Sequence, residues 1–190
     1  AHPVPDSAGL KAAERIKAFV SNLSSNDTVI ALICGGGSAL LPAPPAGFAL
    51  ADEIALNEEL LASGAPISAM NAVRKRFSTI KGGRLAGLTK ARVISFVVSD
   101  IPGDDPALVA SGPTVPDEST CADALALLDR YGVQIGAGLR EQLTQGTLES
   151  AKSHQLPHAE APAIVASAAQ GLRAAQAEAF RVVGITSPLA

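Results

Sequence analysis

The sequence predicts an α/β fold with a three-layer α/β/α arrangement, in which helices cover a mostly parallel, Rossmann-like sheet. Short runs at 28–34 and 92–99 are apolar on both faces, which is typical of parallel strands buried from both sides. Segments with helical spacing separate these runs, and parallel strands require such crossover connections. The 190 residues, 47% hydrophobic and 3% aromatic, suffice for one domain with its own core.

The first helix and the strands each have a local signal. Apolar residues recur at helical spacing over 7–22, and Asp6 or Ser7 can cap this helix. A turn at Asn26 and Asp27 then leads into the first strand. The four strands that we expect lie at 28–34, 92–99, 163–166 and 181–186.

Glycine and proline bound the other helices. Gly64 ends a helix over 50–63, and Pro66 suits the first turn of the next helix, over 66–77. Three further helices are expected: one capped by Ser119 or Thr120 and running through Tyr131, one over 138–143, and one over 168–180. This order of helices and strands fits parallel strands joined by crossovers.

Charge and cysteine content exclude several classes of protein. The net charge is −3, the isoelectric point is near 5.6, and the longest basic run is Arg74-Lys75-Arg76, so broad nucleic-acid binding is not expected. Cys34 and Cys121 lack paired spacing, which argues against a disulfide framework or a zinc site and favours a reduced, cytoplasmic setting. No apolar run approaches the roughly 20 residues of a membrane span.

Two unusual loops follow the first two strands. One is Cys34-Gly35-Gly36-Gly37-Ser38, and the other covers 99–105. Ligands bind beyond the carboxyl ends of parallel strands, at one edge of the sheet. We therefore expect the two loops to lie together and to form the site.

The glycine turn is suited to an anion. Gly35, Gly36 and Gly37 bring no side chains, so their N–H groups can face a ligand, and the Ser38 hydroxyl adds a donor. Neither GxGxxG nor a Walker lysine is present, so no standard nucleotide fingerprint supports the assignment. A tight turn required only for packing remains the alternative.

A basic segment follows at 71–84. Asn71, Arg74 and Ser78 share the polar face of the expected helix, and Lys81 and Arg84 bracket two glycines. Cationic donors beside flexible backbone suit a phosphate or a carboxylate. The alternative is a solvated basic helix end.

Three carboxylates lie at the exit of the second strand. Asp100, Asp104 and Asp105 could hold Mg²⁺ or accept a proton from a substrate hydroxyl. Aspartates next to glycine and proline also form turns, which is the alternative for Asp104 and Asp105 above all.

Five segments together resemble the glycerate 2-kinase family, whose TtuD-like bacterial members are often labelled hydroxypyruvate reductase. The segments are HPVPD (2–6), GGGSALL (35–41), NAVRKRFSTIKGGRLA (71–86), SDIPGDDPALVASGP (99–113) and TVPD (114–117). Two positions depart from the family pattern: Cys34 stands where the family usually has serine, and Arg76 where it often has histidine.

The resemblance implies an ATP-dependent kinase that phosphorylates the 2-hydroxyl of D-glycerate with Mg²⁺, in a cleft between two domains. Because the chain begins without methionine and stops after an expected strand, we expect residues 1–190 to be one α/β domain, part of the N-terminal domain of a longer two-domain protein. Such a fragment would lack its second domain and be inactive alone. No nucleic acid or membrane partner is expected, and a homodimer stays open.

The expected site combines the residues above with the family motifs. Its members are catalytic Asp100, Lys81 and Arg84; substrate- or phosphate-binding Gly35, Gly36, Gly37, Ser38, Asn71 and Arg74; and metal-binding Asp100 and Asp104. Two other functions remain open at this stage: an NAD(P)H-dependent hydroxypyruvate reductase, and a non-catalytic carboxylate-binding domain.

Overall fold

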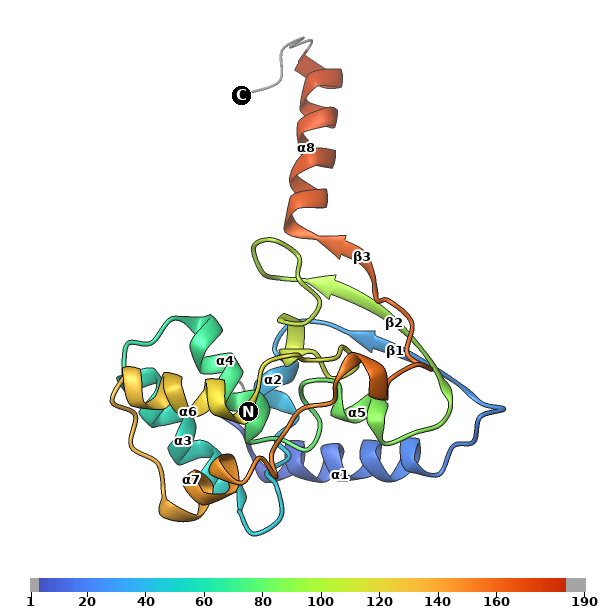
Figure 1. Cartoon of the computed structure of the whole chain (residues 1–190). Helices are drawn as coiled ribbons and strands as arrows, with labels where there is room; N and C mark the ends of the chain where they lie inside the picture. The colour runs from blue at the N-terminus through green and yellow to red at the C-terminus, as the bar shows by residue number, and fades with distance from the viewer. Residues whose placement is uncertain (1–3, 184–190) are drawn as a thin grey trace.

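Three parallel strands form the sheet of this computed structural model, which describes residues 4–183 (Figure 1). They are β1 (Thr28–Ile33), β2 (Arg92–Ser99) and β3 (Ala163–Ser167), in the order β1-β2-β3. β1 pairs with β2 from Thr28 opposite Arg92 onwards, and β2 pairs with β3 with one shift of register. The predicted α/β class with a parallel sheet is confirmed.

One face of the sheet packs against helices. α1 (Ser7–Ser21) runs along this side, with the short α5 (Arg84–Gly87) between it and the strands (Figure 1). Asp6 caps α1, accepting a hydrogen bond from the N–H of Gly9 at 2.8 Å. Val93 and Val97 of β2 are completely buried on this face.

The other face differs from the expectation for β1. Ile30 and Leu32 are 64% and 79% exposed, and β1 alternates between half-buried and exposed residues. The apolar run at 28–34 predicts a strand with both faces covered by other parts of the protein. Among residues 4–183, β1 is instead an edge strand with one face covered and the other exposed. Helices decide whether a face of a sheet is covered, and the apolar run itself does not say which faces they cover.

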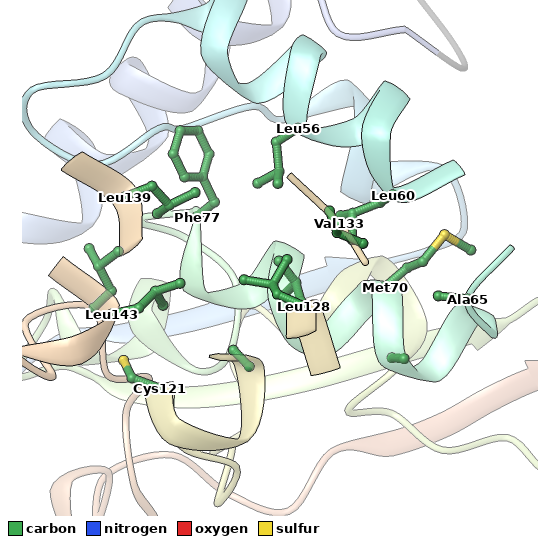
Figure 2. Packing of buried hydrophobic residues seen from close by; sticks show 14 residues of the cluster. Leu56, Leu60, Ala65, Met70, Phe77, Cys121, Leu128, Val133, Leu139 and Leu143 are labelled. Atoms are coloured by element: carbon green, nitrogen blue, oxygen red, sulfur yellow. The ribbon is translucent and has the colours of Figure 1, made fainter. Parts of the chain in front are cut away.

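Four helices pack together beside the sheet and enclose the largest core (Figures 1 and 2). They are α3 (Leu50–Ala62), α4 (Ile67–Arg76), α6 (Cys121–Arg130) and α7 (Ala137–Thr144). Their buried side chains meet in one cluster, which includes Leu56, Leu60, Met70, Val73, Phe77, Leu128, Leu139 and Leu143. Expected helix bounds and observed ones agree within about two residues, because caps and glycines end these helices.

Backbone hydrogen bonds join the two long motifs. The N–H of Gly82 donates to the carbonyl of Ser111 at 3.0 Å, and the N–H of Gly83 donates to that of Gly112 at 2.8 Å. Both glycines have positive φ, 61° and 75°, and a Cβ on Gly83 would lie 2.9 Å from a backbone oxygen. The glycine pair therefore allows the basic segment to dock against the loop that leaves β2.

The C-terminal end of the described chain is helical. α8 (Ala168–Val183) extends away from the sheet (Figure 1). The expected strand at 181–186 is wrong for 181–183, and 184–186 lie outside the described residues, as do His2 and Pro3 of the HPVPD motif. Short helical turns that the sequence did not predict occur at Val109–Ser111 and Ser153–Gln155, and a further short helix, α2 (Gly37–Leu40), begins in the glycine turn.

A search of the described residues for a helix long and apolar enough to cross a membrane found none.

Candidate functional site

The glycine turn and the aspartate loop are in contact. Gly35 follows the end of β1 after one residue, Cys34, and Asp100 directly follows β2. A Cβ placed on Gly35 would lie only 1.7 Å from Asp100 Oδ2, so the carboxylate lies against the bare glycine backbone. The two loops thus share one edge of the sheet, as parallel strands require.

The glycine turn presents free donors. Gly36 has a positive φ of 78°, and in the described part of the chain no hydrogen bond is formed by the N–H groups of residues 35–38. Ser38 Oγ lies 2.8 Å from Ser111 Oγ, which connects the turn to the second loop. Free N–H groups and hydroxyls of this kind can bind a phosphate or carboxylate.

An open cavity of about 320 Å³ lies between these loops and helices α3 and α4. It brings together seven of the expected site residues: Gly35, Gly36, Ser38, Asn71, Arg74, Lys81 and Asp100. Asn57, Ser111 and Pro5 also line it, although the sequence analysis did not single them out. Pro5 and Ser111 lie inside the quoted motifs, whereas Asn57 gave no signal of its own.

Lys81 is the most buried cation of the cavity. Its side chain belongs to a residue that is 3% exposed, and Nζ lies 3.0 Å from Glu53 Oε1. Burial lowers the pKa of this ammonium below its ordinary value, and the charge of Glu53 opposes that shift. Among the described residues, Glu53 provides the one hydrogen bond to Nζ, although an ammonium has three N–H donors.

Arg74 is held from both neighbouring helices. Its Nε donates to Asn57 Oδ1 of α3 at 2.6 Å, and Nη1 donates to Asn71 Oδ1 of α4 at 3.4 Å. Burial lowers the pKa of Arg74 and Glu53 raises it, but a guanidinium stays charged at neutral pH. The cavity lining therefore contains two cations, Arg74 and Lys81, together with the carboxylate of Asp100.

Three expected residues do not line this cavity. Arg84 donates to the backbone carbonyls of Lys75, Lys81 and Leu148; burial, and then the nearby Arg76, lower its pKa to about 10. Gly37 packs against Ala110, where a Cβ would meet the alanine Cβ at 2.8 Å.

Asp104 also lies outside the cavity lining, in a turn with φ of 53°. Within residues 4–183, no group of three or more His, Cys, Asp or Glu side chains could hold a metal ion. Mg²⁺ is often held by one or two carboxylates together with substrate phosphates, and Asp100, an exposed hard oxygen donor beside free N–H groups, fits that arrangement.

A second buried cation, Arg76, lies away from the cavity. It is 1% exposed; Nη2 lies 2.8 Å from Asp117 Oδ2, and the guanidinium also donates to Ser119 and Ser150. Burial alone would raise the pKa of Asp117, but Lys75, Ser119 and Arg76 together hold it below its ordinary value. This network joins the end of α4 to the segment that precedes α6.

The sequence matches a known family over most of its length. The family is described as "Domain of unknown function (DUF4147)", and residues 1–144 match it. The chain belongs to the DUF4147 family.

Named relatives of this DUF4147 chain fall into two groups. A protein of Agrobacterium vitis named "Putative hydroxypyruvate reductase" is 52% identical over 146 residues, which is 76% of this chain and 33% of that protein. The D-glycerate 2-kinase of Thermotoga maritima is 42% identical over 147 residues, 77% of this chain and 35% of the kinase.

A solved structure agrees with the kinase name. The crystal structure of glycerate kinase from Thermotoga maritima superposes with a TM-score of 0.85 and 36% identity, over 95% of this chain and 42% of that one. The DUF4147 chain therefore spans about a third to two fifths of the length of these relatives.

Proposed function

We propose that the complete protein is an ATP-dependent kinase that phosphorylates the 2-hydroxyl of D-glycerate. The observation that supports this most strongly is the position of Asp100, against the bare backbone of Gly35 and in the same cavity as Lys81 and Arg74. Phosphoryl transfer has to bring an acceptor hydroxyl, an anionic phosphoryl group and two cations together.

The residues of the cavity have separate roles in this proposal. The N–H groups of Gly35, Gly36 and Ser38 and the hydroxyl of Ser38 bind phosphate oxygens. Lys81 and Arg74 bind the glycerate carboxylate or offset charge on the transferred group. The glycerate oxygen forms a bond to the γ-phosphorus, the bond from that phosphorus to ADP breaks, and Asp100 accepts the hydroxyl proton.

Asp100 is also the residue that would hold Mg²⁺, together with the phosphates of ATP. The ion supplies charge neutralisation on those phosphates. Arg84 and Asp104 have no part in the chemistry that we propose. Arg84 instead joins the segment 81–84 to the carbonyls of Lys75 and Leu148 through hydrogen bonds.

A coupled assay of ADP release by the complete gene product, with D-glycerate as acceptor, tests the proposal. We expect ADP release that depends on D-glycerate and on Mg²⁺. The name of the Agrobacterium vitis relative favours one second candidate, a hydroxypyruvate reductase. Loss of NADH absorbance with hydroxypyruvate, and no ADP release with glycerate, would support that candidate against the kinase.

A further inference from the structure

Glu53 is a buried carboxylate that the proposed chemistry does not use. It comes from the first turns of α3, is 3% exposed, and forms an ion pair with Lys81 through Oε1. Its second oxygen, Oε2, is buried and has no hydrogen-bond partner among the described residues. Burial of a carboxylate with one oxygen unsatisfied is unfavourable, and a buried ion pair adds little net stability. Stability therefore does not account for this residue.

The position of Glu53 on α3 connects it to both cations of the cavity. Asn57 lies one turn further along the same helix face and accepts the hydrogen bond from Arg74. The side-chain amide of Asn57 also donates to the backbone carbonyl of Glu53, at 2.8 Å. α3 thus contacts Lys81 through Glu53 and Arg74 through Asn57, and Glu53 itself is not among the residues that line the cavity.

We propose that Glu53 is a positioning residue for Lys81: it fixes one N–H of the ammonium so that the other two face the anion in the cavity. This inference rests on the proposed kinase function, and Glu53 touches neither substrate nor ATP. The charged groups around Lys81 are Glu53 from α3, Arg74 from α4, and Asp100, which lines the same cavity from the end of β2. Of these, Glu53 is the one in ion-pair contact with Nζ.

The charge of Glu53 has a second consequence. Burial and the nearby Arg74 both lower the pKa of Lys81, and Glu53 is the group that raises it. Without that carboxylate, the Lys81 ammonium loses its proton at lower pH. If Glu53 positions Lys81, its replacement should change the alkaline part of the pH profile of kcat/KM. If Glu53 is purely structural, that part of the profile should stay unchanged.

The test compares four forms of the complete gene product: wild type, Glu53→Gln, Glu53→Asp and Glu58→Gln. Glu53→Gln keeps the shape and removes the charge, and Glu53→Asp keeps the charge on a shorter side chain. Glu58, exposed on the same helix, is the matched control. We expect the alkaline limb of kcat/KM to move to lower pH by about one unit or more in Glu53→Gln. Glu53→Asp should recover most of that shift, and Glu58→Gln should show none.

A titration of the lysine side chains by NMR gives a readout that does not need activity. The Lys81 signal, assigned from its loss in Lys81→Met, should titrate at lower pH in Glu53→Gln than in wild type. An unchanged Lys81 titration and an unchanged pH profile in Glu53→Gln would overturn the inference and leave the kinase function standing. Absence of glycerate phosphorylation by wild type would instead overturn the proposed function.

Discussion

Two buried cations, Arg76 and Lys81, lie five positions apart on the same segment. They differ in how many hydrogen-bond donors of the charged group remain for a ligand. Arg76 uses both terminal nitrogens inside the protein, on Asp117, Ser119 and Ser150. Of the Arg76 nitrogens, Nε is buried without a hydrogen-bond partner among the described residues. Lys81 uses one N–H on Glu53, has no further hydrogen bond from Nζ among the described residues, and lines an open cavity. A buried cation whose terminal nitrogens are bonded inside the protein holds the fold together, whereas one that lines a cavity with N–H groups to spare is available to a ligand.

The largest expected effect is a loss of stability when Arg76 is replaced. Arg76→Met leaves Lys75, at 3.6 Å, as the one ion-pair partner of the buried Asp117 carboxylate among the described residues, so the free energy of unfolding should fall by about 3–5 kcal/mol. Urea denaturation of the complete gene product measures it. Arg140→Met, which removes an exposed ion pair with Asp129, is the control and should cost about 1 kcal/mol or less. Equal effects of the two changes would contradict the structural role of Arg76.

The next effect falls on catalysis. Lys81→Met removes a charge-stabilising donor, and kcat/KM for glycerate should fall on the order of a hundredfold or more. It also leaves Glu53 unpaired in a buried position, which lowers stability. The double variant Lys81→Met/Glu53→Gln should regain stability, as judged by its urea midpoint, but not activity. Recovery of activity in the double variant would exclude Lys81 from the chemistry.

Gly35→Ala tests the contact between the two loops. The added Cβ would overlap the Asp100 carboxylate, which must then move, while the backbone at Gly35 needs no positive φ. A displacement of this size should lower kcat on the order of a hundredfold and leave the thermal midpoint nearly unchanged. Gly138→Ala, where a Cβ meets nothing within 4 Å, is the matched control. Full activity in Gly35→Ala would show that the position of Asp100 is unimportant.

The smallest effect concerns acid stability. The pKa of Asp117 lies below its ordinary value of 3.8 in the folded protein, so unfolding takes up a proton once the pH drops below that value. The stabilisation is complete above the unfolded pKa and is lost as pH falls through the folded one. Asp117→Asn should therefore show a shallower acid-induced loss of stability than wild type below about pH 4, measured by urea midpoints across pH. Parallel curves would contradict the assignment.

The sequence predicts local structure better than long-range partners. The bounds of β2 agree with the expected strand, since an apolar run between polar turns defines a strand locally. The meeting of Gly35 and Asp100 also follows from parallel strands alone. The pairing of Glu53 with Lys81 joins positions 28 apart, and Arg84 reaches a carbonyl 64 residues away. No periodic pattern contains such pairings, so Arg84 was expected in the site and Glu53 was not.

In the proposed reaction, Asp100, placed by the bare glycine turn, accepts the proton of the attacking hydroxyl. The most direct measurement is ³¹P NMR of the product formed from D-glycerate and ATP by wild type and by Asp100→Asn, both as complete gene products. We predict 2-phosphoglycerate from wild type and formation slowed about 10²–10⁴-fold in the variant. Formation at the same rate by both proteins, or phosphate on another oxygen, would contradict the account.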